Sequence, residues 1–211
     1  MDILLAGATG LVGSRCLPRL LDAPDVERVV APARRQIAVQ HPKLERHIID
    51  FTRLGAARCL FNVDKIICTL GTTIRQAGSQ ERFREVDLAY PLEMARLGRE
   101  QGVRHFLLVS ALGADAESNV FYNRVKGEVE LGLRALGYPQ LTILRPSLLL
   151  GKRGEFRLGE EFGKRLAFLV PGKYRPVQAD DVAKVLVEAA RQDVPGVEVI
   201  ESADIRRRAA R

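Results

Sequence analysis

The chain has 211 residues, of which 46% are hydrophobic and 28% are charged, and this balance excludes a disordered or fibrous protein. The net charge is +7, but four arginines in the last six residues supply more than half of it. Since no nucleic-acid-binding motif accompanies this short basic tail, we predict no nucleic-acid partner and interpret the tail as a solvated, mobile chain end.

Short apolar runs alternate with longer amphipathic segments along the chain. Several runs are almost continuously apolar, as expected of parallel strands that are covered on both faces. The predicted strands cover residues 2–7, 26–32, 45–50, 64–70, 104–110, 141–146 and 197–202. The predicted helices cover residues 11–21, 81–101, 119–136, 155–169 and 179–191, with a short candidate helix at 54–60.

This alternation predicts an α/β fold with a doubly wound, Rossmann-like parallel sheet and helices on both of its faces. We expect the strand order 3-2-1-4-5-6 and right-handed crossovers. The whole chain, residues 1–211, is predicted to form one domain. A small C-terminal cap within about residues 147–178 is expected to cover a substrate site.

The first predicted strand runs into GATGLVG, in which three glycines have the G-x-x-G-x-x-G spacing of a dinucleotide-binding turn. The first glycine permits a tight turn, the second lets a pyrophosphate approach the backbone, and the third allows close packing of helix on strand. The pyrophosphate is expected at the amides that open the next helix. A glycine-rich turn needed only for packing is the alternative. The predicted cofactor contacts are Gly7, Thr9, Gly10, Leu11, Val12 and Gly13.

Arg34 and Arg35 follow the second strand, at the place where enzymes that use NAD carry an acidic residue for the ribose hydroxyl. Guanidinium groups suit a 2′-phosphate, so the sequence favours NADP(H) over NAD(H), with a pair of solvated loop arginines as the alternative. Because Pro32 has no N–H to give to a sheet, we expect this strand to end by Ala31. Further cofactor contacts are predicted after strands three, four and six, at Asp50, Phe51, Leu70, Gly71, Thr72 and Pro146.

Tyr122 and Lys126 lie four residues apart in FYNRVKGEVE, a stretch that is predicted to be helical, so their side chains share one helix face. A free tyrosine, with a pKa of about 10, is a poor acid or base at neutral pH, and a nearby lysine can make it more acidic. Two polar residues on a wet helix face are the alternative. Ser110 stands at the end of the fifth predicted strand, on the same rim of the sheet.

The combination of GATGLVG, Ser110, the Tyr122-x-x-x-Lys126 pair and RPSLLLGKR resembles the short-chain dehydrogenase/reductase superfamily, specifically its atypical members. The stretch CTLGTTIRQAGSQERFREVD resembles the Tat-interacting-protein-like branch. The resemblance implies that Ser110 polarises a substrate carbonyl and that Tyr122 transfers the proton. It also implies that Lys126 holds the nicotinamide ribose and assists the tyrosine. Asp87 is a departure, since many members carry an asparagine on this helix.

These observations predict an NADP-dependent oxidoreductase that acts on a small carbonyl or alcohol of unknown identity. A non-catalytic NADP(H)-binding regulator with a protein partner stays open as an alternative. A nucleotide-sugar epimerase is a third reading, although few residues follow Pro146 to bind so bulky a substrate. The sequence is compatible with a monomer or a homodimer.

The three cysteines, Cys16, Cys59 and Cys68, are scattered, and neither they nor the histidines show metal-ligand spacing. We therefore predict reduced thiols and no metal. The apolar N-terminus lacks a basic region and is broken by glycines, so we do not interpret it as a signal peptide. No apolar stretch has the length of a membrane span. A cytoplasmic protein without a membrane partner is expected.

Overall fold

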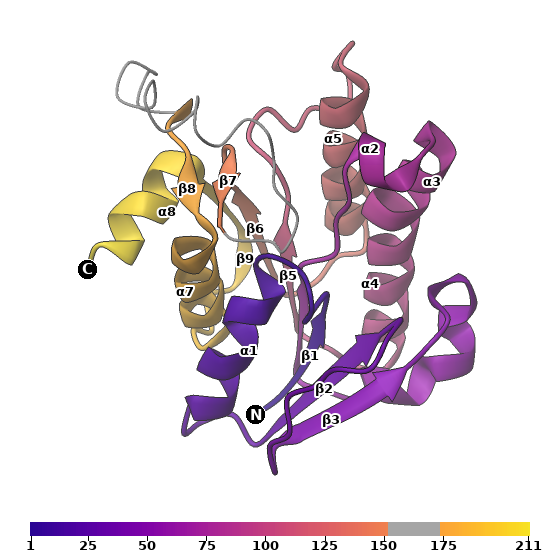
Figure 1. The fold of residues 1–211 in the computed structure, drawn as a ribbon, viewed down its shortest axis with the longest axis vertical. Coiled ribbons are helices and arrows are strands. Elements are labelled where there is room, and N and C mark those ends of the chain that lie inside the picture. The colour runs from indigo at the N-terminus through magenta and orange to yellow at the C-terminus, as the bar shows by residue number, and fades with distance from the viewer. Residues whose placement is uncertain (152–173) are drawn as a thin grey trace.

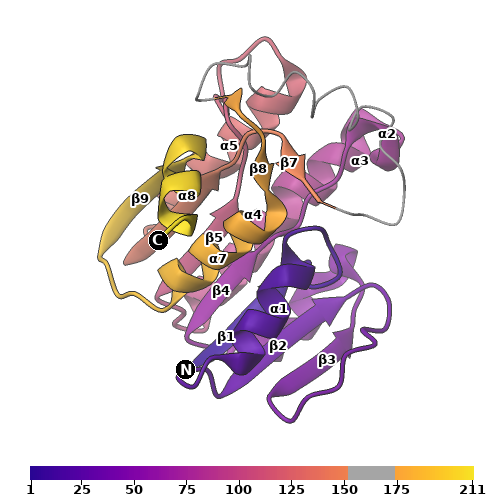
Figure 2. The same ribbon diagram turned by 60° about the vertical axis from the view of Figure 1, so that its left-hand side comes forward.

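Seven parallel strands form a central sheet in the order β3-β2-β1-β4-β5-β6-β9 in the computed structural model, which describes residues 1–151 and 174–211 (Figure 1). The predicted order 3-2-1-4-5-6 is confirmed, and β3 and β9 lie at opposite edges of the sheet (Figure 2). The strands are β1 Asp2–Ala6, β2 Arg28–Ala33, β3 Leu44–Ile48, β4 Lys65–Cys68, β5 His105–Val109, β6 Gln140–Arg145 and β9 Gly196–Glu201.

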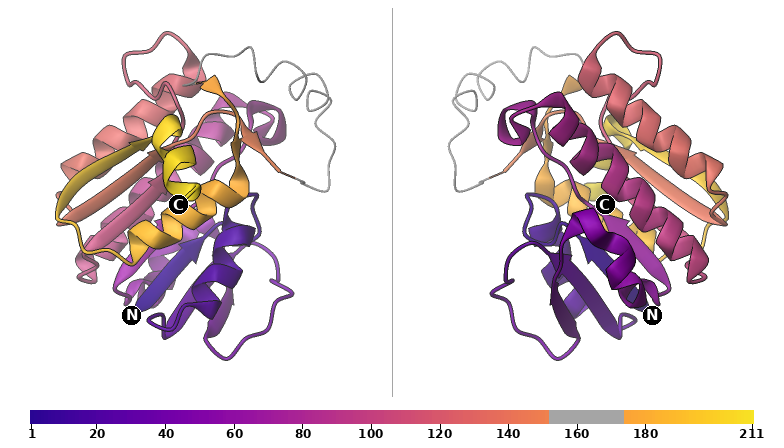
Figure 3. Two further views of the ribbon diagram at one scale, coloured as in Figure 1. Left: turned by 90° about the vertical axis from the view of Figure 1, so that its left-hand side faces the viewer. Right: turned by 90° about the vertical axis from the view of Figure 1, so that its right-hand side faces the viewer.

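Helices cover both faces of the sheet, as predicted, and Figure 3 shows one helical layer in front of the strands in each view. The layer on one face consists of α1 Gly13–Asp22, α7 Ala179–Ala190 and α8 Ser202–Ala209. The other layer contains the 3₁₀ helix η1 Phe51–Phe61, α4 Tyr90–Glu100 and α5 Phe121–Ala135. Two short helices and a π-helical turn precede α4, namely α2 Ile74–Ala77, α3 Gln80–Arg84 and η2 Glu85–Ala89.

The continuously apolar strands divide their side chains between two cores. Successive residues of a strand point to opposite faces of a sheet. In β1, Ile3 and Leu5 pack in the core under α1 and α7, whereas Leu4 and Ala6 pack in the core under η1, α4 and α5. All four residues are fully buried, which is why β1 contains no polar position after Asp2.

Pro32 does not end β2, contrary to the sequence-based expectation, because the strand continues to Ala33. Pairing between β2 and β1 stops at Val30, and beyond that residue β2 pairs with β3 alone, where Pro32 lies opposite His47. A proline can occupy a strand position that is not required to donate a hydrogen bond. The missing N–H therefore falls where β2 has a neighbour on one side only.

The basic C-terminal tail is ordered, so the expectation of a mobile end is wrong. Residues Ser202–Ala209 form α8, whose Ile205 is completely buried against α7 and the sheet. Lys184 of α7 donates to the carbonyl of Ala209 at 2.8 Å, and Arg208 pairs with Glu198 of β9 at 2.7 Å. The apolar Ile205, directly before the run of arginines, attaches the tail to the domain.

The predicted helix at 155–169 lies outside the described residues, as does most of the predicted cap within 147–178. The residues that flank this gap form a small parallel sheet of β7 Leu149–Leu150 and β8 Val177–Gln178. Within 1–151 and 174–211, no helix is long and apolar enough to cross a membrane. The same residues contain no cluster of three or more side chains suited to hold a metal ion.

Candidate functional site

Two adjoining cavities open at the carboxyl ends of the central strands. The first has a volume of about 620 Å³ and lies over the glycine-rich turn after β1 and the end of β2. The second, of about 550 Å³, lies over the ends of β4, β5 and β6. The loop 69–72 after β4 lines both cavities, so one ligand could extend from the first into the second. Parallel sheets bind ligands at this edge.

The glycine-rich turn packs too closely for side chains. Gly7 has a φ of +85°, a backbone conformation that favours glycine, and its carbonyl accepts from the amide of Gly10 at 2.8 Å. A Cβ on Gly13 would lie 2.1 Å from the carbonyl oxygen of Gly7 and 2.6 Å from Oγ1 of Thr69. Gly7 and Gly13 thus hold β1, the start of α1 and the loop after β4 against one another.

The start of α1 is suited to a pyrophosphate. Its N-cap residue, Val12, provides no side-chain hydrogen bond, and its first turn contains no acidic residue. Helix N-termini attract anions through their unpaired amides and the helix dipole. Thr9 and Gly10 line the first cavity, and Leu11 and Val12 line the second. Gly13 lines neither cavity and supports the turn from behind.

The far end of the first cavity is basic and aromatic. Arg34 and Arg35 line it, and neither forms an ion pair within the described part of the chain. Phe51 packs against Tyr90, with ring centroids 5.7 Å apart, and the Arg82 guanidinium lies 6.0 Å from the Tyr90 ring centroid. An adenine ring could stack in such surroundings and a phosphate could bind the arginines. The residues therefore fit an adenine dinucleotide.

Asp50, which the sequence predicts as a cofactor contact, caps a helix in the structure. Its carboxylate caps η1 by accepting from the amide of Thr52 at 2.9 Å and from the hydroxyl at 2.7 Å. These hydrogen bonds keep the pKa of Asp50 below its usual value. Phe51, its neighbour, does line the first cavity, but Asp50 does not. An aspartate that precedes a helix is well suited to capping.

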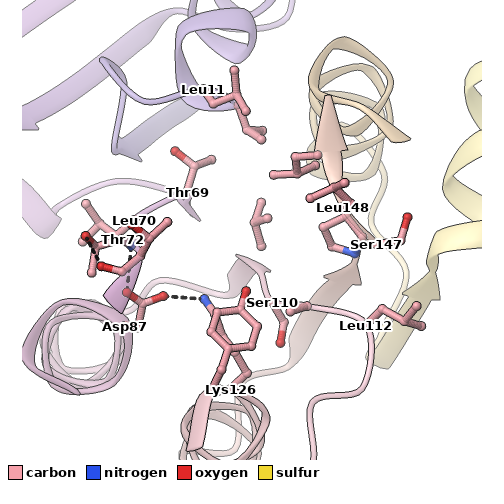
Figure 4. Close-up of a pocket in the computed structure, with 18 of the residues that line it drawn as sticks. Leu11, Thr69, Leu70, Thr72, Asp87, Ser110, Leu112, Lys126, Ser147 and Leu148 are labelled. Carbon is pink, nitrogen blue, oxygen red and sulfur yellow. Dashed lines mark hydrogen bonds and ion pairs between the residues drawn. The ribbon is translucent and has the colours of Figure 1, made fainter. Parts of the chain in front are cut away.

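Ser110, Tyr122 and Lys126 all line the second cavity, together with Leu70, Gly71, Thr72 and Pro146. Figure 4 shows Ser110 and Lys126 near each other in this cavity. Ser110 lies directly after β5, while the tyrosine and lysine lie one turn apart on α5. Lys126 is nearly completely buried, and 37% of the Tyr122 surface is exposed at the cavity. The three side chains predicted from the sequence are thus brought to one place.

Lys126 forms a buried ion pair with Asp87, which the sequence did not reveal (Figure 4). Its Nζ lies 2.7 Å from Oδ1 of Asp87, and Oδ2 of the same carboxylate accepts from the amide of Thr72 at 2.8 Å. Burial alone would lower the pKa of Lys126, but the adjacent carboxylate leaves it above its usual value. The lysine is therefore charged at neutral pH.

Asp87 lies in a π-helical turn just before Pro91. Pro91 has no N–H and cannot donate to the carbonyl four residues earlier, which belongs to Asp87. The helix widens here into η2, where the amide of Tyr90 bonds to the carbonyl of Glu85, five residues back. Single π-helical turns of this kind are frequent at functional sites.

Ser110 donates its hydroxyl proton to a second buried carboxylate. Its Oγ lies 2.5 Å from Oε1 of Glu130, one turn beyond Lys126 on α5. Arg145 of β6 binds both oxygens of Glu130, with its NH2 nitrogen 2.6 Å from Oε2, and also pairs with Glu201 at 3.1 Å. The guanidinium holds the carboxylate of Glu130 in place and so fixes the direction in which the serine donates.

We predict that Glu130→Gln will lower the free energy of unfolding by about 2 kcal/mol, because the charge-assisted bonds to Arg145 become neutral ones. The matched control is Glu128→Gln on the same helix, whose partner Arg84 is partly exposed. This control should lose less than about 1 kcal/mol. Urea unfolding measures both variants, and equal losses would contradict the assigned role of Glu130.

Three further residues of the site became visible only in the structure: Arg82, Tyr90 and Glu130. Asp87 was noticed as a departure from a family pattern, but its partner could not be identified. The spacing of Glu130, four residues after Lys126, was an available signal, because it places both side chains on one helix face. Arg82 and Tyr90 carried no comparable pattern.

Comparison with known proteins identifies relatives across nearly the whole chain. Protein FMP52, mitochondrial, of Eremothecium gossypii is 34% identical over 97% of this chain and 96% of its own length. Protein HTATIP2 (Tat-interacting protein 2) of Rattus norvegicus is 31% identical over 88% of this chain and 78% of its own length. The resemblance to the Tat-interacting-protein-like branch is therefore confirmed.

These relatives overturn the expectation of a cytoplasmic protein, because the similar FMP52 proteins of several fungi are described as mitochondrial. That expectation rested partly on unpaired cysteines. Free thiols are typical of any reducing environment and do not distinguish one reducing compartment from another.

Solved structures match in fold. MoeE5 in complex with UDP-glucuronic acid and NAD superposes with a TM-score of 0.74 at 19% identity, over 95% of this chain and 75% of its own. UDP-glucose 4-epimerase of Thermotoga maritima gives a TM-score of 0.73 at 18% identity, over 95% and 76%. A family model described as NAD(P)H-binding matches residues 7–193. Given this match and the relatives above, the chain belongs to the NAD(P)H-binding family that has the Rossmann-like fold.

Proposed function

We propose that the protein is an NADP-dependent oxidoreductase of the short-chain dehydrogenase/reductase type, which interconverts a small carbonyl compound and its alcohol. The observation that carries this proposal is the meeting of Ser110, Tyr122 and Lys126 in a cavity next to a cleft that fits an adenine dinucleotide. A serine, a tyrosine and a lysine can together hold a reacting oxygen and move its proton.

In carbonyl reduction, Tyr122 donates its phenolic proton to the carbonyl oxygen and takes it back when the alcohol is oxidised. A reduced nicotinamide, when bound, supplies the hydride. Lys126 stabilises the phenolate that remains after proton donation. Ser110 must rotate its proton away from Glu130 to donate to the substrate oxygen, because the only hydroxyl proton of the alcohol is the one that passes to Tyr122.

The second cavity supports a small substrate with apolar substituents. Its volume of about 550 Å³ is within the range of small-molecule sites. Apolar side chains line it, including Val109 at the end of β5, Leu112 after the same strand and Leu148 after β6. Part of its volume would be taken by the nicotinamide, which leaves less room for the substrate.

A panel of aldehydes and ketones incubated with the protein and NADPH tests this proposal. We expect NADPH consumption with at least one apolar member of the panel. Tight NADPH binding without consumption across the panel would instead support a non-catalytic, cofactor-binding regulator.

Arg34 and Arg35 support the preference for NADP(H), since a 2′-phosphate would meet two guanidinium groups without ion-pair partners in the described chain. Arg35→Asp should weaken NADPH binding about 100-fold through loss of a charge-assisted bond and added repulsion. NADH affinity should stay within about threefold, because NADH has no 2′-phosphate.

Calorimetric titration measures both affinities. Arg53→Asp is the matched control, since Arg53 is exposed on η1 and lines neither cavity. Equal affinities of the parent protein for NADPH and NADH would contradict the proposed preference.

A further inference from the structure

Asp87 brings a negative charge to the lysine that should promote ionisation of Tyr122. Its carboxylate is 1% exposed and lines the same cavity as Lys126 and Tyr122. One oxygen contacts Nζ of Lys126 at 2.7 Å and the other binds the amide of Thr72 at 2.8 Å. The carboxylate therefore has two fixed contacts, which hold it beside the ammonium group.

The charge of Asp87 opposes the electrostatic effect of Lys126 on the phenol. A cation near a phenol favours phenolate, and an anion near it favours the protonated form. When the two charges lie 2.7 Å apart, their fields largely cancel at a third group farther away. A neutral asparagine at this position would still accept from Thr72 through its amide oxygen but would leave the lysine charge uncompensated.

The other charged groups packed around this site do not replace Asp87. Cys68 of β4 lies near the ion pair, and burial raises the pKa of its thiol to about 12, so it is neutral at neutral pH. Two nearby carboxylates have cationic partners of their own, Glu130 with Arg145 and Glu128 with Arg84. Arg124 and Asp115 contact the Ser118 carbonyl and the Glu117 amide, and neither pairs with Lys126. Tyr174 lines the same cavity.

We propose that Asp87 sets the pH range in which Tyr122 exchanges its proton, by offsetting the charge of Lys126, and that it thereby shifts the working range of the enzyme toward alkaline pH. Asp87 is a positioning residue in this account, because it acts through Lys126 and Thr72. The inference rests on the proposed oxidoreductase function for its catalytic consequence, but the electrostatic effect itself requires no turnover.

The test is a titration of the Tyr122 phenol by ultraviolet difference absorbance in protein without cofactor. The signal of Tyr122 is isolated by subtracting the same variant that also carries Tyr122→Phe. In Asp87→Asn the midpoint of phenol ionisation should fall by about one pH unit relative to the parent protein. An unchanged or higher midpoint in a folded Asp87→Asn variant would overturn the proposal.

Lys126→Gln gives an independent arm if Asp87→Asn fails to fold. This change leaves the Asp87 charge in place, so the midpoint should rise above that of the parent. The double variant Asp87→Asn/Lys126→Gln removes both charges and should titrate near the parent. If the midpoint of phenol ionisation in Lys126→Gln is at or below that of the parent protein, the charge of Asp87 does not offset that of Lys126.

The pH dependence of turnover separates this inference from the proposed function. Where a substrate is found, the rate profile for alcohol oxidation by Asp87→Asn should move to lower pH by about the same one unit. A shift in the phenol midpoint without turnover in any variant would support the electrostatic role of Asp87 and contradict the proposed oxidoreductase function. Turnover by Asp87→Asn with an unshifted pH–rate profile and an unshifted phenol midpoint would support the oxidoreductase function and contradict the proposed role of Asp87.

Discussion

Tyr122→Phe is expected to lower turnover about 1000-fold, which is within the usual contribution of a positioned acid or base. The change removes one oxygen atom and keeps the ring, whose centroid lies 5.7 Å from that of Phe83. The cavity should therefore keep its shape, and NADPH affinity should stay within about twofold, since only the transferable proton is lost. Steady-state rates and calorimetry measure the two effects.

Tyr138→Phe is the control for this prediction. The Tyr138 hydroxyl donates to the carbonyl of Ala95 at 2.6 Å and lies outside both cavities. Its loss should affect stability and leave the rate nearly unchanged. If a working substrate is found and Tyr122→Phe converts it at the parent rate, Tyr122 is not the proton donor and the Tyr122–Lys126 pair is an inherited scaffold.

Gly13→Ala should cost at least about 3 kcal/mol of unfolding free energy, because an added methyl group would overlap the backbone of the turn. The new Cβ would lie 2.1 Å from the carbonyl oxygen of Gly7, a distance that no side-chain rotation can relieve. The start of α1 would have to move away from β1, and the cradle for a pyrophosphate would open. Urea unfolding should show the loss, and NADPH binding should weaken at least about tenfold in the variant that remains folded.

Gly55→Ala is the matched control, because no atom lies within 4 Å of the Cβ it would add. Its backbone does not require glycine, so the replacement should be neutral or slightly stabilising. If Gly13→Ala is as stable as Gly55→Ala, α1 is not held against β1 in the way described.

The layered fold could be predicted because each buried strand is visible in the sequence as a separate apolar run. Strands buried on both faces need continuous apolar runs, and the run from Ile3 to Ala6 is divided between two cores. The predicted end of β2 was wrong because the loss of stability caused by a proline depends on which strands pair with that position. The sequence of β2 does not show that its pairing with β1 stops at Val30.

The sequence reveals the glycine turn and the Tyr122–Lys126 pair because their residues have a characteristic local spacing. It reveals Ser110 because this residue follows a predicted strand. The partners of these residues were not accessible, since they come from other elements. Asp87 reaches Lys126 across the gap between η2 and α5, and Arg145 reaches Glu130 from β6. The capping role of Asp50 was also not accessible, because an aspartate after a strand can either face the ligand edge or cap the next helix, and the carboxylate caps η1 in the structure.

Transfer of deuterium from NADPH that carries deuterium at both C4 positions of the nicotinamide tests the central claim most directly. The protein is first shown by calorimetry to bind the labelled NADPH and is then mixed with the carbonyl panel, and the products are analysed by mass spectrometry. With the parent protein we expect one deuterium on the former carbonyl carbon of the product alcohol for each NADPH oxidised. With Tyr122→Phe we expect almost no deuterated alcohol in the same time. Bound NADPH that transfers no deuterium to any member of the panel, or equal transfer by the parent and Tyr122→Phe, would contradict the proposed mechanism.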